Sequence, residues 1–357
     1  MSKPTEYYYK GLVLAALEIT PSNPQHGDEV EFADSSSGGR AVFLMKVKEY
    51  EKGKFKATYV SPERAARHVE LFPKLNKTNK DTSPLFVVHG FDIQPAQHMS
   101  NVADKWLNFT DAGLKYYPIP VLWPCNKKFC FLSRYRFDQE DFSQRAGAEF
   151  KAMVDAIPND LFPRKSLLMH SMGNHVVFNG ACGVKDEEGK VIDKAPDVQF
   201  ENIFVVAADV PHDIFWVEPY EYDSCCGCGN KERRKRLFGQ KKQKATNFFK
   251  MLKVDESGKP IGKIYVLHHR RDLLLLASST PFANNETRIG SVSHKKDGQD
   301  KVRADMKDYI EDYDVYSEIS CCCCGSDIDC FKHEYEFEPF AIEFYFSKDI
   351  GKLKEVV

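Results

Sequence analysis

The stretch Leu167-Leu168-Met169-His170-Ser171-Met172-Gly173-Asn174 places a serine directly after a short apolar run. This pattern is typical of a nucleophile elbow, in which a buried strand ends and the chain turns sharply into a helix, so that the turn lifts one serine hydroxyl above the sheet. A serine hydroxyl is a weak nucleophile unless a histidine accepts its proton and an acid orients that histidine. We therefore predict that Ser171 is a nucleophile and that a later acid and a later histidine complete a triad.

Similar apolar runs recur from residue 84 onward. They occupy residues 85–88, 119–122, 166–169, 203–207 and 264–267, and amphipathic helical patterns at 96–114, 141–157 and 173–182 separate the first four. Short apolar strands that alternate with helices predict an α/β fold with a mostly parallel central sheet and helices on both faces. Ligands of such sheets bind beyond the carboxyl ends of the strands, so the residues that follow each run are the candidates for a site.

The first 80 residues have a different pattern. Strands are predicted at residues 12–19, 41–47 and 55–60, and polar turns separate them. This pattern predicts an N-terminal antiparallel β extension over residues 1–80, followed by the α/β domain over residues 81–357. Residues 217–260 interrupt the alternation of that domain, and we predict that they form an insertion that covers the site as a lid or faces a partner.

The partners of Ser171 should follow it in the order acid, then histidine, each on a loop after a later strand. Asp272 follows the apolar run at 264–267, and His333 follows a further strand predicted at 313–319. We predict that His333 acts as general base and then as general acid, and that Asp272 orients its ring. Asp209, at the end of the preceding strand, is the reserve acid, and His294 is the competing histidine.

An oxyanion hole needs two hydrogen-bond donors near the nucleophile. The backbone N–H of Met172 is one candidate, and the N–H of Phe91 is the other, because Gly90 before it permits a tight backbone path. Each such donor typically contributes ~3 kcal/mol of transition-state stabilisation. The candidate substrate-binding residues around these groups are His89, Gly90, Trp123, His170, Phe215 and Trp216.

Several of these segments together resemble a known superfamily. They are Phe86-Val87-Val88-His89-Gly90-Phe91, Leu122-Trp123-Pro124-Cys125 followed by Tyr135-Arg136-Phe137-Asp138, His170-Ser171-Met172-Gly173-Asn174, Ala207-Ala208-Asp209-Val210-Pro211, residues 265–272, and His333-Glu334-Tyr335. In this order they are similar to a poorly characterised, esterase- or lipase-like branch of the α/β-hydrolases, over about residues 85–350. The resemblance implies hydrolysis of an ester, thioester or lipid through an acyl-enzyme, without a cofactor.

Met169 departs from the family pattern, which usually has Gly or Ala two positions before the nucleophile. A relaxed elbow at this point would make the chain a catalytically weak or inactive binding or scaffold protein, and this is the alternative function. Reaction with a fluorophosphonate probe separates the two readings, since only an activated serine is labelled.

The composition fits a globular protein. The chain has 357 residues, a formal net charge of -2 and 42% hydrophobic residues, which gives no reason to expect nucleic acid as a partner. No apolar run approaches the ~18 residues of a membrane span, and the N-terminus has no apolar signal core, so we expect a cytoplasmic protein. The basic run at residues 231–244 is a candidate for peripheral contact with an anionic membrane.

The eleven cysteines gather in two places, Cys225-Cys226-Gly227-Cys228 and the consecutive cysteines at residues 321–324. If the two loops meet, they could hold zinc, but consecutive cysteines point to opposite sides of an extended chain and neither cluster has C-x₂-C pairing. Lipidation and plain thiols are the other readings. Because a serine triad needs no metal, we expect neither a catalytic metal nor a cofactor.

Overall fold

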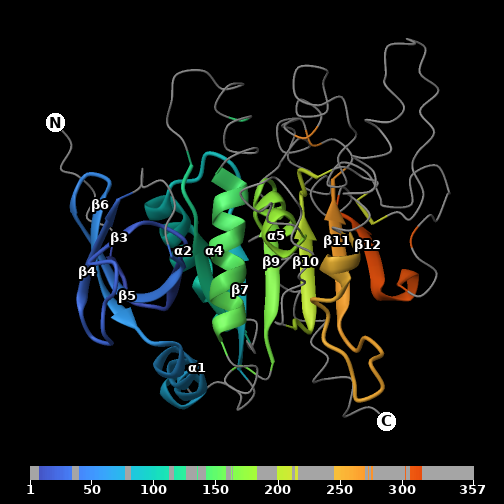
Figure 1. Ribbon diagram of the computed structural model, residues 1–357, viewed down its shortest axis with the longest axis horizontal. Helices are drawn as coiled ribbons and strands as arrows, with labels where there is room; N and C mark the ends of the chain where they lie inside the picture. Colours follow the sequence, from blue (N-terminus) through green and yellow to red (C-terminus); the bar gives the residue numbers. More distant parts are fainter. Residues whose placement is uncertain are drawn as a thin grey trace.

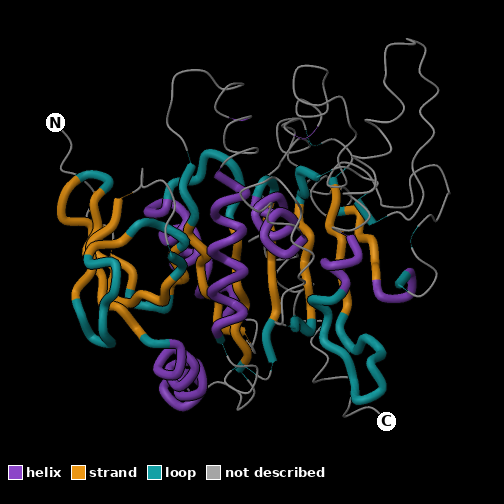
Figure 2. Tube along the Cα trace, in the orientation of Figure 1, coloured by secondary structure: helices purple, strands orange, loops and turns teal. Residues whose placement is uncertain are grey.

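The computed structural model describes most of the chain, drawn in colour in Figure 2. The described residues are 8–33, 40–76, 82–111, 116–125, 142–157, 164–182, 199–210, 245–269 and 306–315, together with Tyr135, Phe162, Ile214, Phe215, Asp272, Leu275 and Val302.

Six parallel strands form the centre of the sheet. They are β7 (Ser83–Val88), β8 (Tyr116–Leu122), β9 (Ser166–His170), β10 (Asn202–Val206), β11 (Lys263–His268) and β12 (Ile310–Asp314). Their order across the sheet is β12-β11-β10-β9-β7-β8, and every neighbouring pair is parallel. All residues of β7, β8, β9 and β10 are buried, as the continuous apolar runs predict for strands covered on both faces.

Helices cover both faces of these strands and complete the predicted α/β fold. Figure 1 shows α4 (Ser143–Ala156) and α5 (Gly173–Cys182) in front of the sheet and α2 (Pro95–Asp111) behind it. Along β7, Phe86 and Val88 belong to the core under α4 and α5, whereas Leu85 and Val87 belong to the core that includes Val102 of α2. This alternation follows from the two-residue period of a strand.

The strand order reverses at β7, which has β8 on one side and β9 on the other. The chain therefore leaves the carboxyl ends of β7 and β9 in opposite directions, and a crevice opens between such loops in open α/β sheets. We call the loops that follow β7, β9, β10 and β11 the carboxyl edge. Gly90 and Ser171 follow β7 and β9 and lie on this edge.

The N-terminal strands are antiparallel to one another and continue the same sheet, at the left of Figure 1. They are β1 (Tyr8–Tyr9), β2 (Val13–Ala15), β3 (Ile19–Thr20), β4 (Glu29–Ala33), β5 (Val42–Glu51) and β6 (Lys54–Val60). The junction is β2, which pairs parallel with β8 and antiparallel with β5. The N-terminal β extension is thus continuous with the α/β sheet.

Several elements differ from the sequence-based prediction. The strand β1 was not predicted, and the two short strands β2 and β3 stand where one strand was predicted over residues 12–19. The last strand runs over Ile310–Asp314, not over 313–319, of which residues 316–319 lie outside the described part. The sequence analysis did not predict β4 or the helix α1 (Pro62–Asn76), which follows β6. Charged side chains alternate with apolar ones in β4, and Ala65, Ala66 and Val69 of α1 pack on the core, so both elements carry a periodic pattern that was overlooked.

Part of the predicted insertion belongs to the core. Phe248, Met251 and Leu252 are fully buried, and the ring of Phe248 stacks on Phe178 of α5 with ring centroids 4.3 Å apart. The amide of Phe200, just before β10, donates to the carbonyl of Met251 at 2.6 Å. Residues 245–260 are therefore attached near the amino ends of the strands. The rest of the insertion, residues 217–244, lies outside the described residues, so the prediction of a lid now rests on that part.

Candidate active site

Ser171 stands at the turn between β9 and α5 with a backbone φ of 51°, which is rare for a residue other than glycine. Four hydrogen bonds hold this backbone. The Ser171 amide donates to the carbonyl of Val206 at 3.0 Å. The Ser171 carbonyl accepts from the side-chain amide of Asn174 at 2.9 Å, from the Asn174 backbone amide at 3.2 Å and from the Asp209 amide at 3.2 Å. The predicted elbow is therefore present as a strained, firmly held turn.

Two glycines allow the segments around Ser171 to approach closely. A Cβ atom on Gly173 would lie 2.6 Å from the carbonyl oxygen of His89, so only glycine lets α5 begin against the end of β7. A Cβ atom on Gly90 would lie 2.9 Å from the Cβ of Ser171 and 3.1 Å from Nδ1 of His170. The loop after β7 thus rests directly on the predicted nucleophile.

The two predicted oxyanion donors belong to two loops that meet at Ser171: Met172 directly follows Ser171, and Phe91 follows Gly90, which approaches the Cβ of Ser171 closely. Met172 is fully buried, and its backbone N–H makes no hydrogen bond with any described residue. Phe91 is half-buried and directly follows Gly90, and Asp92 after it has a φ of 63°, so the loop turns sharply at this point. Two backbone amides from adjacent loops are the usual source of an oxyanion hole in this kind of fold.

His89 and Trp123 hold the loop that follows β7 through hydrogen bonds to its backbone. The amide of Trp123 donates to Nε2 of His89 at 3.3 Å, so the ring proton sits on Nδ1, which donates to the carbonyl of Gly90 at 2.9 Å. The indole N–H of Trp123 donates to the His89 carbonyl at 2.9 Å, and the two rings stack 5.0 Å apart. Both side chains are buried, so their contacts position Gly90.

A second imidazole lies behind the first. The His98 ring centroid is 4.8 Å from that of His89, and its Nε2–H donates to the carbonyl of Val87 at 3.0 Å. Burial lowers the pKa of His98 to about 4. Burial, with His98 nearby, also holds the pKa of His89 well below its ordinary value. Both rings are therefore neutral at physiological pH, which excludes them as the group that titrates near pH 7.

The two candidate acids follow neighbouring strands at the carboxyl edge. Asp209 follows β10, is 2% exposed, and accepts a hydrogen bond from the hydroxyl of Tyr135. Asp272 follows β11 and is fully buried. One of its carboxylate oxygens accepts from the amide of Leu275 at 3.0 Å, which fixes the turn after the strand. Both carboxylates are held by hydrogen bonds at the carboxyl edge. The order of the residues along the chain therefore does not by itself decide which of the two is the acid of the triad.

The remaining predicted residues fall into two groups. Phe215 is fully buried in an aromatic cluster with Phe178, Phe248 and Phe249, with ring centroids 5.7 to 5.9 Å away, so it belongs to the core. Outside the described residues lie His333, His294, Trp216, the basic run at 231–244 and the cysteine clusters at 225–228 and 321–324.

Sequence reasoning gave no role to Asn174 or Tyr135. Asn174 is fully buried, and its side-chain amide donates to the carbonyls of both Met169 and Ser171, at 3.1 and 2.9 Å. A signal for it was available, because a short amide in the first turn of a helix commonly bonds to nearby backbone. Tyr135 begins a segment that resembles the family, but nothing in that segment predicts its hydrogen bond to Asp209, which is distant in the sequence.

Across the described ranges, no three His, Cys, Asp or Glu side chains gather as a metal site. No helix among the described elements is long and apolar enough to cross a membrane.

Comparison with known proteins agrees with the α/β fold. No curated protein matches the chain. Residues 63–316 match the family described as alpha/beta hydrolase of unknown function (DUF900). The matched region holds Ser171, Asp209 and Asp272 and ends before His333. Since the match covers most of the chain, this protein belongs to that family of α/β-hydrolases.

Proposed function

We propose that this hydrolase cleaves carboxylic esters or related acyl bonds through an acyl-enzyme on Ser171. The observation that carries the proposal is the backbone of Ser171, held at a φ of 51° by hydrogen bonds from Asn174 and Asp209. A strained residue costs about 1–3 kcal/mol, and such residues cluster at functional sites. A serine that only capped a helix would not need this conformation.

The proposed reaction has two steps. The hydroxyl oxygen of Ser171 attacks the acyl carbon while His333 accepts its proton, and the oxyanion that forms receives hydrogen bonds from the amides of Met172 and Phe91. His333 then gives the proton to the leaving alcohol, and the acyl group stays on Ser171. Water attacks this ester by the same route, with Asp272 stabilising the imidazolium in both steps.

We propose that the substrate is a small acyl ester or a lipid and that the protein acts in the cytoplasm. A lipid substrate would suit the basic run at residues 231–244, which could hold the enzyme at an anionic membrane. The chemistry requires neither a metal nor a cofactor.

Labelling with a fluorophosphonate probe tests the proposal. We expect the wild-type protein to be labelled and Ser171→Ala to be unlabelled while still folded. Hydrolysis of p-nitrophenyl acetate by Ser171→Ala should fall by about 10⁴- to 10⁶-fold, because loss of one triad member removes nearly the whole benefit of the triad.

Ser166→Ala is the matched control. Ser166 is buried on the same strand as the elbow, at its opposite end, so the substitution removes a buried hydroxyl without touching the site. It should keep both labelling and hydrolysis. If folded wild-type protein is never labelled, the proposal is wrong, and the reading as a catalytically inactive binding or scaffold protein takes its place.

A further inference from the structure

The side chain of Tyr135 connects two loops of the candidate active site. Tyr135 is 6% exposed, and its hydroxyl donates a hydrogen bond to the carboxylate of Asp209. Its ring meets the ring of Phe91 at an angle of 72°, with centroids 5.5 Å apart. Tyr135 therefore contacts the loop after β10 with one end and the loop after β7 with its ring.

Asp209, which accepts the hydrogen bond from the Tyr135 hydroxyl, sets the position of Ser171. The loop after β10 lies along the elbow, with Val206 accepting from the Ser171 amide at 3.0 Å and Asp209 donating to the Ser171 carbonyl at 3.2 Å. Between them, Ala207 has a φ of 43°, so this loop is strained as well. Any movement of Asp209 would move the carbonyl of Ser171, and with it the peptide that carries the Met172 amide.

The ring of Phe91, which packs on the ring of Tyr135, restrains the conformation of the loop after β7. The amide of Phe91 is the other proposed oxyanion donor, and Gly90 before it touches Ser171. The Gly90 carbonyl, which shares a peptide with the Phe91 amide, accepts from Nδ1 of His89 at 2.9 Å, so this loop is already held on one side. The packing of the Phe91 ring on Tyr135 adds a second restraint on the direction of this amide.

We propose that Tyr135 is a positioning residue that keeps each of the two oxyanion donors at a fixed distance from Ser171. This inference rests on the proposed function, because it assumes that an oxyanion forms there. Tyr135 does not touch the reacting atoms. It acts through Asp209 on one donor and through Phe91 on the other, and its hydroxyl makes Asp209 a fixed part of the elbow.

The test is Tyr135→Phe, which removes the hydroxyl and keeps the ring against Phe91. We expect kcat for p-nitrophenyl acetate and the rate of fluorophosphonate labelling to fall together by about 10- to 100-fold, because small misplacements of catalytic groups cost factors of this size. KM should change little, since the oxyanion exists only in the transition state and in the intermediates.

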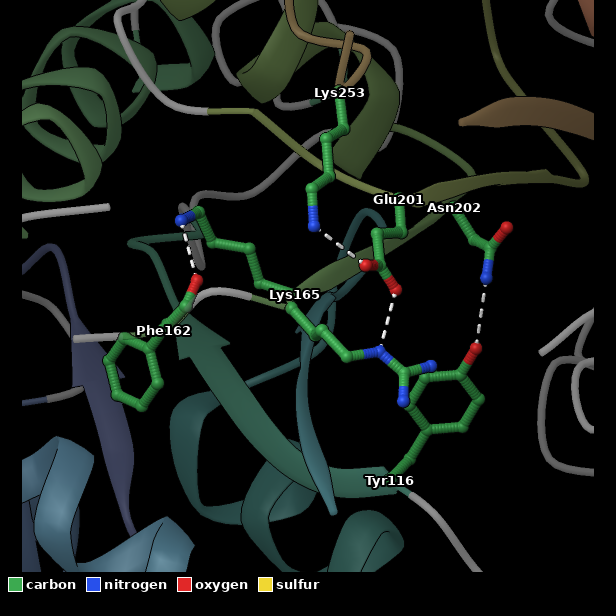
Figure 3. Close-up of polar contacts among 7 residues, drawn as sticks. Tyr116, Phe162, Lys165, Glu201, Asn202 and Lys253 are labelled. Carbon is green, nitrogen blue, oxygen red and sulfur yellow. Dashed lines mark hydrogen bonds and ion pairs between the residues drawn. The ribbon is translucent and has the colours of Figure 1, made fainter. Parts of the chain in front are cut away.

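Tyr116→Phe is the matched control for the loss of a buried hydroxyl. Tyr116 is buried on β8, and its hydroxyl accepts from the side-chain amide of Asn202 at 3.1 Å, at the amino end of the strands (Figure 3). Both variants should lower the melting temperature to a comparable extent. Only Tyr135→Phe should lower kcat, so a decrease in kcat in both would show a merely structural role and overturn the proposal.

Variants of Asp209 complete the test. Asp209→Ala removes the acceptor of the Tyr135 hydroxyl, so it should lower kcat by as much as Tyr135→Phe does. The double variant Tyr135→Phe/Asp209→Ala should lose no more than either single variant, because the two groups act as a unit. A loss of about 10⁴-fold in Asp209→Asn would identify Asp209 as the triad acid and overturn the positioning role.

The two proposals fail in different ways. If the wild-type protein is labelled and Tyr135→Phe is labelled at the same rate, the role of Tyr135 is wrong and the proposed function stands. If the wild-type protein is never labelled, the proposed function is wrong and the role of Tyr135 falls with it.

Discussion

Ser171 has a backbone conformation that costs energy, and its surroundings supply the compensation. Asn174 donates from both its side chain and its backbone to the Ser171 carbonyl, and Asp209 adds a third donor. A carbonyl that accepts several bonds from rigid neighbours has one preferred direction. The elbow can therefore hold the hydroxyl in place before any substrate binds, which is the condition for efficient attack.

His89 and His98 make the loop after β7 sensitive to acid. The ordinary pKa of a histidine is 6.5, and the pKa of His98 in the folded protein is about 4. The unfolded chain therefore binds more protons than the folded protein between these values, so the free energy of unfolding falls as the pH is lowered through this window. His89 shifts in the same direction and adds to the effect.

We expect the contribution of His98 to the free energy of unfolding to fall by about 3 kcal/mol as the pH falls from 6.5 to 4. His98→Gln should reduce this loss, because glutamine does not titrate and can still donate to Val87. Denaturant unfolding at a series of pH values measures it. His26→Gln, at an exposed position, is the control. Parallel stability curves for wild type and His98→Gln would contradict the prediction.

At the residue scale, the predictable part of the site was the local part. Ser171, Met172 and Gly90 each stand beside the end of an apolar run, so topology alone brings them to one edge. Tyr135 could not be found in this way, because its bond to Asp209 joins segments far apart in the sequence and depends on the packing of the ring. Phe215 follows a strand too, but its neighbours Phe178 and Phe248 place it in the core.

At the scale of elements, the two ends of the central strands have different roles. At the amino end, the amide of Glu201 donates to the carbonyl of Lys165, and its own carbonyl accepts from the Lys263 amide, both at 2.9 Å. Its carboxylate forms ion pairs with Arg164 at 3.0 Å and with Lys253 at 2.9 Å (Figure 3). Glu201 therefore ties β9, β10 and β11 together where they begin.

The burial of Lys165 shows that the amino end of these strands is shielded from solvent. The amine of Lys165 is buried and donates to the carbonyl of Phe162 at 2.9 Å (Figure 3). Burial and the nearby charge of Lys253 lower the pKa of Lys165 to about 8. A charge is costly in such surroundings, so the carboxylate of Glu201 is the group that makes three neighbouring cations tolerable.

Glu201→Ala should lower the free energy of unfolding by about 2–3 kcal/mol, because it leaves Arg164 and Lys253 without their partly buried partner. Glu29→Ala is the control, since Glu29 pairs with Lys56 on the exposed surface of the N-terminal strands and should change little. Chemical denaturation of both variants gives the comparison. The kcat of Glu201→Ala should stay near wild type if the amino end is structural, and equal stability of the two variants would refute the assignment.

The edge strand β12 illustrates the limit of pattern reading for elements. Its sequence, Ile310-Glu311-Asp312-Tyr313-Asp314, carries three carboxylates and only its first residue is buried. An apolar run is a signal for strands covered on both faces, whereas a strand at the end of a sheet is less covered. The prediction was therefore placed too late in the chain, although β7 to β11 were located within a few residues.

At the scale of the whole molecule, the described sheet is continuous but has two parts, the parallel strands β7 to β12 and the antiparallel N-terminal strands. The two parts differ in sequence pattern. The parallel strands β7 to β11 were predictable because an apolar run marks each of them. The pairing of β2 with β8 was not, because it joins residues about a hundred positions apart and depends on which sheet edge is open. Residues 12 to 17 are nevertheless all fully buried, which shows how deeply the N-terminal part enters the core.

This arrangement predicts that the N-terminal strands are needed for folding, although the family match begins only at residue 63. A chain that begins at residue 62 would lose the hydrogen bonds from Leu12 to the Tyr117 hydroxyl and from Ala16 to the Leu122 carbonyl, at 2.9 and 2.8 Å. It would also expose the edge of β8, all of whose residues are buried. We expect this truncated chain to aggregate or remain unfolded, because a long apolar strand edge has no cover.

Circular dichroism, thermal unfolding and fluorophosphonate labelling of the truncated chain measure this. Leu14→Ala in the full chain is the graded control. Leu14 is fully buried, so its truncation should cost about 2–5 kcal/mol and leave a folded protein that is still labelled. A truncated chain that unfolds cooperatively and reacts with the probe at the wild-type rate would show that the α/β part is independent. The N-terminal strands would then be an accessory to the sheet that they extend.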